Sequence, residues 1–180
     1  MALEYTPIEA LPNVRNFSLH LVFQGLDTFL QIVEELRESF TTGKTRDLAF
    51  RRQQLQLLAY LLEENREAFK DAFRKDMGRP WFETFVGDID SSISDITTLQ
   101  ANMYKFAAPQ KAPGGIAFGF SEPHFKREAR GLCYIAGPYN YPILCLLVPA
   151  AGAIAAGNTA LIKVSCCPLS VSSAQAGIAE

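Results

Sequence analysis

Residues 131–162 form one stretch without a charged side chain, GLCYIAGPYNYPILCLLVPAAGAIAAGNTALI, which ends at Lys163. A stretch this long and this apolar is buried, either in a lipid bilayer or inside a folded domain, because its exposure to water is unfavourable. About 20 consecutive apolar residues are enough to cross a bilayer as a helix. The length of the stretch therefore allows both a membrane anchor and the interior of a domain.

The prolines of this stretch favour the interior of a domain. Pro138, Pro142 and Pro149 each remove a helical N–H donor, and Gly157 followed by asparagine is typical of a helix end. Divided in this way, the stretch contains a strand over 130–136, a helix of small residues over 141–156 and a strand over 159–164. This order is a βαβ unit, whose strands are buried on both faces and are apolar throughout. We therefore predict a parallel sheet and no membrane span within this chain.

Amphipathic helices are predicted upstream of this unit. Apolar side chains recur at three- and four-residue spacing over 26–40, over 47–77 with a break near Asn65, and over 81–106. Gly43 and Gly78 follow the first two segments and are predicted to end them. The third helix is expected to point five residues inward: Ile89, Ile93, Ile96, Met103 and Phe106.

The predicted fold class is α/β, with an N-terminal helical layer followed by the first βαβ unit of a Rossmann-like parallel sheet. Residues 1–24 are expected to be an irregular lead-in, residues 25–106 the helical segment, residues 107–128 a linker or oligomerisation arm, and residues 129–180 the start of the sheet domain. The strand that ends at Lys163 is expected to pair with further parallel strands. Without them, one edge of this strand is expected to be exposed.

Composition excludes several classes of protein. The chain has 17 basic and 19 acidic residues, a formal net charge of −2, and no basic patch of the kind that binds nucleic acid. The N-terminus, MALEYTPIEALPN, lacks the basic and apolar regions of a signal peptide. Four cysteines without paired spacing indicate neither a disulfide framework nor a zinc site. We therefore expect a cytoplasmic protein that binds neither nucleic acid nor a metal ion.

The acidic residues and histidines carry little chemical signal. Asp88, Asp90 and Asp95 lie close together in the third helix, but carboxylates along a helix usually mark its solvated face. His20 and His124 have no aspartate or cysteine at motif spacing. None of these five residues is predicted to be catalytic.

One polar group of residues interrupts the apolar stretch, at the sequence GPYNYP. The amide of Asn140 could donate to a developing oxyanion, or it could cap the helix or shape the turn. Lys163 ends a buried strand, where ligands of α/β sheets bind, or it could simply extend its ammonium group into water. The residues alone leave both pairs of alternatives open.

At these residues the chain resembles the aldehyde dehydrogenase superfamily. That pattern is a strand and loop G-V-V-x-x-I-x-P-W-N-Y-P, then G-A-x-x-A-G-N, then a strand ending in K-P-S-E. The chain has GLCYIAGPYNYP, GAIAAGN and LIKVS at the same separation. The segments TGKTRDLAFRRQQLQLLAYLLEENREAF and KDMGRPWFE are similar to the class 3 and fatty aldehyde dehydrogenase branch. The resemblance extends over residues 25–165.

The resemblance implies an NAD(P)-dependent oxidation of an aldehyde to a carboxylic acid, in the N-terminal part of an aldehyde dehydrogenase fold that dimerises at full length. Asn140 matches the asparagine of the oxyanion hole, which donates to the thiohemiacetal oxygen. Gly137 and Tyr139, together with Asn140, match the loop that lines the nicotinamide-ribose side of the cofactor. Lys163 matches the lysine that holds the adenosine ribose hydroxyls or a 2′-phosphate. The implied cofactor is NAD or NADP.

The chain departs from the family pattern in three ways. Tyr139 replaces the usual tryptophan and keeps an aromatic ring. Val164 and Cys166 stand where proline and glutamate complete K-P-S-E, and a thiol is a much weaker acceptor than a carboxylate. The nucleophilic cysteine and the general-base glutamate of the family belong beyond Glu180. We therefore expect the 180-residue chain to be inactive alone. The alternative is a non-catalytic relative that acts as an interaction or decoy module.

Overall fold

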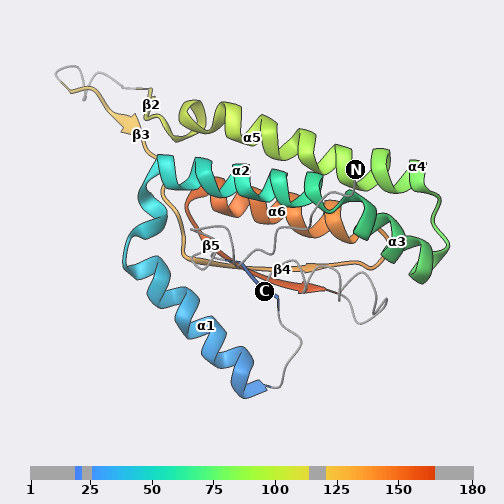
Figure 1. Cartoon of the computed structure of the whole chain (residues 1–180). Helices are drawn as coiled ribbons and strands as arrows, with labels where there is room; N and C mark the ends of the chain where they lie inside the picture. The colour runs from blue at the N-terminus through green and yellow to red at the C-terminus, as the bar shows by residue number, and fades with distance from the viewer. Residues whose placement is uncertain (1–18, 22–25, 114–120, 165–180) are drawn as a thin grey trace.

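A three-stranded parallel sheet is the framework of the molecule, with a stack of helices on one face and a single helix on the other (Figure 1). The computed structural model describes residues 19–21, 26–113 and 121–164. Its elements follow in the order β1 (Leu19–Leu21), α1 (Leu26–Thr41), the 3₁₀ turn η3 (Lys44–Arg46), α2 (Leu48–Glu64), α3 (Arg66–Met77), α4 (Trp81–Thr84), the π-helical segment η4 (Phe85–Asp90), α5 (Ser91–Ala107), β2 (Gln110–Lys111), β3 (His124–Phe125), β4 (Leu132–Gly137), α6 (Pro142–Ala156) and β5 (Thr159–Val164).

The predicted βαβ unit is confirmed by β4, α6 and β5. The two strands pair in parallel, from Leu132 opposite Thr159 to Gly137 opposite Val164. Helix α6 begins with Pro142 in its first turn, where the missing N–H has no intrahelical acceptor in any case. It ends at Gly157, which adopts the left-handed conformation with φ of 90°.

The position of β5 corrects two expectations. The sheet order is β1-β5-β4, so β5 is the central strand and has no free edge. Its second neighbour is β1, whose Leu19 pairs with Ala160 and whose Leu21 pairs with Ile162. Residues 19–21 are therefore not part of an irregular lead-in. A three-residue strand takes its hydrogen bonds from a partner far along the chain, and local periodicity gives no sign of it. Residues 1–18 and 22–25 lie outside the described part.

The predicted helical layer is confirmed, and its packing follows the apolar stripes. In α2 the side chains of Leu55, Leu58 and Leu62 are fully buried, and in α3 those of Phe69 and Phe73 are. Helices α2 and α5 pack on each other and on α6, which separates them from the sheet (Figure 1). Helix α1 contacts β4 and β5 from the side away from α6 (Figure 1).

Local signals in the sequence account for the boundaries of these helices. The carboxylate of Asp47 caps α2 by accepting hydrogen bonds from the amides of Ala49 at 3.0 Å and Phe50 at 3.3 Å. The predicted break near Asn65 separates α2 from α3. Gly78 ends α3 in the left-handed conformation, with φ of 65°.

The third predicted helix differs from the expected one in two respects. It contains the π-helical segment η4, whose wider turn directs the neighbouring residues Asp88 and Ile89 together into the interior. Phe106 is 51 % exposed and does not point inward, because the last turn of α5 extends past the buried Met103 toward β2. Ile96 is fully buried, as predicted.

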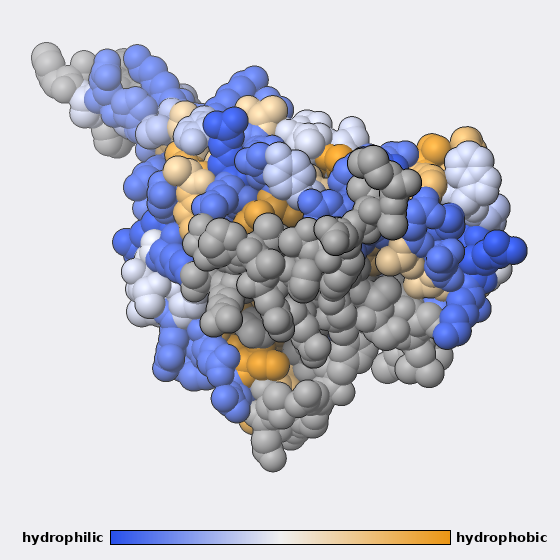
Figure 2. Space-filling model, viewed as in Figure 1, coloured by the Kyte–Doolittle hydropathy of each residue, from blue (hydrophilic) through white to orange (hydrophobic). Residues whose placement is uncertain are grey.

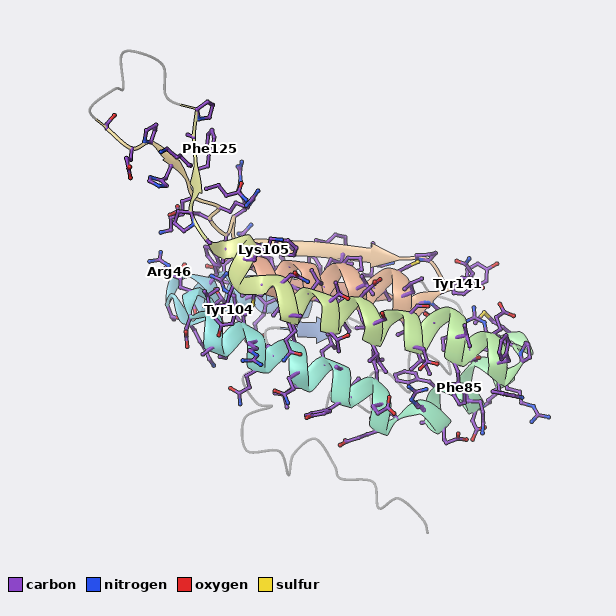
Figure 3. All side chains as sticks on the ribbon, turned by 90° about the horizontal axis from the view of Figure 1, so that it is seen from above. Arg46, Phe85, Tyr104, Lys105, Phe125 and Tyr141 are labelled. Carbon is purple, nitrogen blue, oxygen red and sulfur yellow. The ribbon has the colours of Figure 1, made fainter. Side chains whose placement is uncertain are left out.

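The region predicted as a linker or arm over 107–128 contains a short antiparallel pair. Strand β2 pairs with β3, Gln110 opposite Phe125, and the pair projects from the body at the end of α5 (Figures 1 and 3). Phe125 is 62 % exposed. Residues 114–120, and residues 165–180 with Cys166 and Cys167, lie outside the described part.

The surface of the described residues is largely polar, with a hydrophobic group over α4 (Figure 2). Phe82 is 61 % exposed and Val86, in the turn that follows, 48 % exposed. None of the helices among the described residues combines the length and the apolar character that crossing a bilayer would require.

Candidate functional site

The candidate site lies where β4 and β5 end side by side. Gly137 is the last residue of β4, and Lys163 pairs with the residue before it, Ala136. The side chain of Lys163 is exposed. Two of the predicted site residues, 26 positions apart in the sequence, are thus neighbours at the carboxyl edge of the sheet. This is the edge at which open α/β sheets bind their ligands.

Gly137 is a glycine because α6 passes close to the end of β4. A Cβ atom at this position would lie 2.5 Å from Cγ and Cδ2 of Leu146. Leu146 is fully buried in the main apolar core. The lack of a side chain therefore lets the strand and the helix meet, and it fixes where the next loop leaves the sheet.

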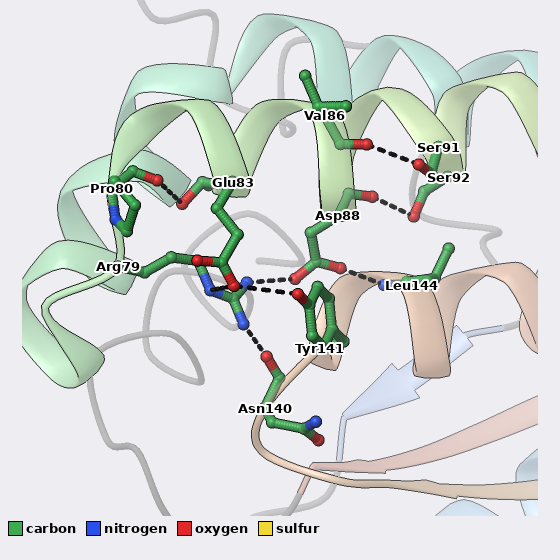
Figure 4. Close-up of polar contacts among 11 residues, drawn as sticks. Arg79, Pro80, Glu83, Val86, Asp88, Ser91, Ser92, Asn140, Tyr141 and Leu144 are labelled. Carbon is green, nitrogen blue, oxygen red and sulfur yellow. Dashed lines mark hydrogen bonds and ion pairs between the residues drawn. The ribbon is translucent and has the colours of Figure 1, made fainter.

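The loop after β4 carries the other two predicted residues. Tyr139 is 54 % exposed. Asn140 is also exposed, and its side-chain amide points away from the helical layer (Figure 4). The amide of Asn140 is thus free of the capping role that was its alternative: α6 is preceded by Tyr141 and receives no hydrogen bond from a capping side chain at that position.

Arg79, which the sequence analysis did not select, anchors this loop. Its Nη2 donates to the backbone carbonyl of Asn140, and its Nη1 donates to Oδ2 of Asp88 at 3.0 Å (Figure 4). Its guanidinium lies 4.5 Å from the ring centres of both Phe73 and Tyr141. The side chain is only 5 % exposed. Two aromatic rings pack against the guanidinium, and two acceptors bind its N–H groups. Together these contacts fix the orientation of the buried side chain.

Asp88 is the second residue of this network, and its predicted place on a solvated face was wrong. The side chain is fully buried, and Oδ1 accepts a hydrogen bond of 2.6 Å from the amide of Leu144. This amide belongs to the first turn of α6, where amides lack intrahelical acceptors. Asp88 therefore caps α6 from another helix, in place of Tyr141. Burial raises the pKa of Asp88, although the Leu144 amide and Arg79 act in the opposite direction.

Asp90 and Asp95, the other two acidic residues of this group, lie on the solvated face, as predicted. Asp95 is exposed, and Asp90 forms a partly exposed ion pair with Arg66 at 2.5 Å. Helical periodicity alone could not distinguish Asp88 from Asp90. The one available signal in the sequence was Gly87, which indicates a close contact at this point of the helix. A Cβ atom at position 87 would lie 3.3 Å from Cε1 of the Tyr141 ring.

Tyr141 links the loop to the helical layer a second time. Its hydroxyl donates to Oε1 of Glu83 at 3.0 Å, and this carboxylate also lies 3.7 Å from Nε of Arg79. The hydrogen bond to Glu83 raises the pKa of the Tyr141 hydroxyl, since loss of the proton would place two negative charges together.

The opposite end of α6 is tied to the start of β4 by Asn158. Its Oδ1 accepts hydrogen bonds from the amides of Arg130 at 2.7 Å and Gly131 at 2.9 Å, and its side chain is buried. A small cavity at this end is lined by Thr45, Phe50, Arg51, Gln54, Ile154 and Asn158. It lies at the far end of α6 from Asn140, so it is not the candidate site.

Among the described residues, no thiol stands ready as a nucleophile beside Asn140. Cys133 and Cys145 are unpaired and partly buried. Burial raises the pKa of the Cys133 thiol, which disfavours the thiolate that nucleophilic attack needs. The same residues contain no cluster of three or more side chains suited to a metal ion.

Comparison with known proteins agrees with this geometry. The sequence profile described as the aldehyde dehydrogenase family matches residues 25–176. Aldehyde dehydrogenase family 3 member B1 of Rattus norvegicus is 34 % identical over 140 residues, which are 78 % of this chain and 30 % of that protein. The chain thus spans less than a third of the length of this relative.

Solved structures share the fold. The substrate-bound state of Staphylococcus aureus AldH has a TM-score of 0.76 and 25 % identity, over 83 % of this chain and 32 % of that one. Succinic semialdehyde dehydrogenase from Streptococcus pyogenes, in complex with NADP+, has a TM-score of 0.74 and 18 % identity, over 92 % and 37 %. The NAD+ complex of aldehyde dehydrogenase from Bacillus cereus has a TM-score of 0.68 and 23 % identity, over 82 % and 30 %.

The predicted resemblance and the predicted fold class are therefore confirmed: with a helical layer on a parallel sheet and a family match over residues 25–176, this chain belongs to the aldehyde dehydrogenase family.

Proposed function

We propose that this chain forms the oxyanion and cofactor side of an NAD(P)-dependent site that oxidises an aldehyde to a carboxylic acid. The observation that carries the proposal is the common edge of β4 and β5, where Gly137, Asn140 and Lys163 lie at or next to the strand ends. The family membership supports the reaction class, and the NAD+ and NADP+ complexes among the structural neighbours support the cofactor class.

Each residue has a distinct role in this proposal. Asn140 donates its side-chain N–H to the oxygen of a thiohemiacetal as negative charge develops there, which lowers the barrier electrostatically. Lys163, with its exposed ammonium, holds ribose hydroxyls or a 2′-phosphate of the cofactor. The backbone at Gly137, where the loop leaves β4, lines the nicotinamide-ribose side, and the exposed ring of Tyr139 forms a wall beside it.

We propose further that the chain does not turn over aldehydes by itself. Thiohemiacetal formation requires a thiolate, and the environment of Cys133 disfavours one. The chain also spans about 30 % of the length of its family 3 relative. From the family membership we also propose a homodimer of the full-length form and a fatty aldehyde as substrate. We propose a cytoplasmic location because the unpaired Cys133 and Cys145 are consistent with a reducing compartment.

Cofactor binding tests the proposal without requiring turnover. The ¹⁵N-labelled chain is titrated with NAD+ and, separately, with NADP+, and amide shifts are followed by NMR. We expect amide shifts confined to the carboxyl edge of β4 and β5. In Lys163→Ala, the affinity for the cofactor obtained from these shifts should fall at least about tenfold. The matched control is Lys105→Ala, because Lys105 is exposed and lies in the last turn of α5, far from Tyr141 (Figure 3). The absence of shifts at this edge, or equal weakening in both variants, would overturn the proposal.

A further inference from the structure

The loop that carries Asn140 is held through its backbone and not through the side chain that is proposed to act. Arg79 reaches the carbonyl of Asn140 across 61 residues of sequence. The Leu144 amide, in the first turn of α6, donates to Asp88 at 2.6 Å. Arg79 and Asp88 are themselves joined at 3.0 Å, so one buried pair binds the chain at two points where the loop enters α6 (Figure 4).

We infer that Arg79 and Asp88 are positioning residues, which set the direction of the Asn140 side-chain amide by fixing the backbone between Asn140 and the first turn of α6. This inference rests on the proposed function only in that Asn140 is the oxyanion donor. In this way, two residues of the helical layer contribute to the chemistry at the carboxyl edge of the sheet.

The shape of arginine explains why this pairing suits the task. Its planar guanidinium presents several N–H donors in a fixed fork, so one group can bind Asp88 and the Asn140 carbonyl at once. The flanking rings of Phe73 and Tyr141, each 4.5 Å away, prevent the plane from rotating. A lysine ammonium has the same charge but neither the fork nor the plane.

The role of Asp88 depends on η4. The π-helical turn brings Asp88 to the interior next to Ile89, and both are fully buried. From there one carboxylate oxygen meets Arg79 and the other meets Leu144. An acidic group at the start of a helix also interacts favourably with the helix dipole, which strengthens the hold on α6.

The molecule contains a matched control for this pair. Arg66 also binds two carboxylates, Glu63 at 2.7 Å and Asp90 at 2.5 Å, and its guanidinium lies 5.8 Å from the ring centre of Phe85. Its side chain is 27 % exposed, and the groups it contacts among the described residues, Glu63, Phe85 and Asp90, all belong to the helical layer. Arg66→Lys therefore removes the same chemical features from the same helical layer without changing the support of Asn140.

The experiment compares amide hydrogen exchange of the 180-residue chain with that of Arg79→Lys, Asp88→Asn and Arg66→Lys. In Arg79→Lys, we expect protection of the Leu144 and Cys145 amides, which donate to Asp88 and to the Tyr141 carbonyl, to fall at least about tenfold relative to the amides of β5 and α2. Asp88→Asn keeps an oxygen acceptor for Leu144, so a smaller loss is expected at these two amides. Arg66→Lys is expected to leave the ratio unchanged.

A purely structural role would give a different pattern. If Arg79 only stabilised the fold, all regions of Arg79→Lys would lose protection in parallel, and that result would overturn the inference. Unchanged protection of the Leu144 and Cys145 amides would overturn it as well. The result is independent of the proposed function: a failure of cofactor to shift the sheet edge of the unmodified chain would count against that function, while the exchange ratio would still report whether Arg79 and Asp88 hold the loop.

Discussion

The carboxylate of Asp88 accepts a hydrogen bond of 2.6 Å from the backbone amide of Leu144, so an acidic residue of one helix caps another that begins 54 residues after it. Helix α6 is preceded by Tyr141, whose side chain does not cap it. The stability of α6, and with it the exit of the loop from the sheet, therefore depends on a contact between distant segments.

Replacement of Asp88 by leucine should be strongly destabilising. It leaves the buried Arg79 without its carboxylate partner and the Leu144 amide without an acceptor, a combination expected to cost about 3–5 kcal/mol. Asp88→Asn should cost less, because its amide oxygen can still accept from Leu144. Urea unfolding measures both values. Asp90→Asn, which alters a partly exposed pair, should change the free energy of unfolding by no more than about 1 kcal/mol. Equal effects at positions 88 and 90 would contradict the assignment of Asp88 as the buried cap.

The stability of the protein should depend on pH through Asp88. Because burial raises the pKa of Asp88, the folded protein binds this proton more tightly than the unfolded chain does. The stability gained from the proton is complete below the unfolded pKa of about 3.9 and is lost as the pH rises through the folded value. The free energy of unfolding of the unmodified chain, minus that of Asp88→Asn, should therefore fall as the pH is raised from about 4 to neutrality. Urea titrations of both proteins across this range measure the difference; a difference that rises with pH would show that the pKa is lowered instead.

Gly137→Ala should destabilise the protein by about 1–3 kcal/mol through overpacking, because the new Cβ atom would meet the buried side chain of Leu146. Gly152→Ala is the matched control. Gly152 lies inside α6, and a Cβ atom there would meet nothing within 4 Å, so alanine should stabilise the helix by about 0.5–1 kcal/mol. Thermal unfolding distinguishes the two. A gain in stability at position 137 would contradict the close approach of β4 and α6.

Asn158→Ala should cost about 2 kcal/mol or more, since the amides of Arg130 and Gly131 both lose the acceptor Oδ1. Asn102→Ala provides the comparison, because Asn102 makes one exposed hydrogen bond within α5, at 2.9 Å from the carbonyl of Thr98. Chemical unfolding of the two variants should differ by more than about 1 kcal/mol. If both cost the same, Asn158 does not hold the start of β4.

The sequence predicted the parts of the fold whose causes are local. The strand over 159–164, the helix that begins at Pro142 and the ends at Gly43 and Gly78 follow from apolar runs, proline and glycine. It did not predict β1 or the π-helical turn at 85–90, because each depends on partners elsewhere in the chain.

The candidate site shows the same division. Resemblance placed Asn140 and Lys163 on one unit, and the register of β4 and β5 brings Lys163 beside the end of β4. Arg79 lies in a turn and Asp88 on a helix with other carboxylates, so their types and spacing give no sign that they meet. Only the packing of the helical layer on α6 joins them to the loop.

We propose that this chain holds the cofactor and oxyanion side of an aldehyde dehydrogenase site without the thiolate side. One NMR experiment tests both parts: the labelled chain is incubated with NAD+ or NADP+ and a medium-chain aldehyde. We expect amide shifts at the carboxyl edge of β4 and β5, an aldehyde proton signal that persists, and no reduced cofactor. Conversion of the aldehyde to carboxylate with formation of NADH or NADPH would contradict it, and so would the absence of any shift at that edge.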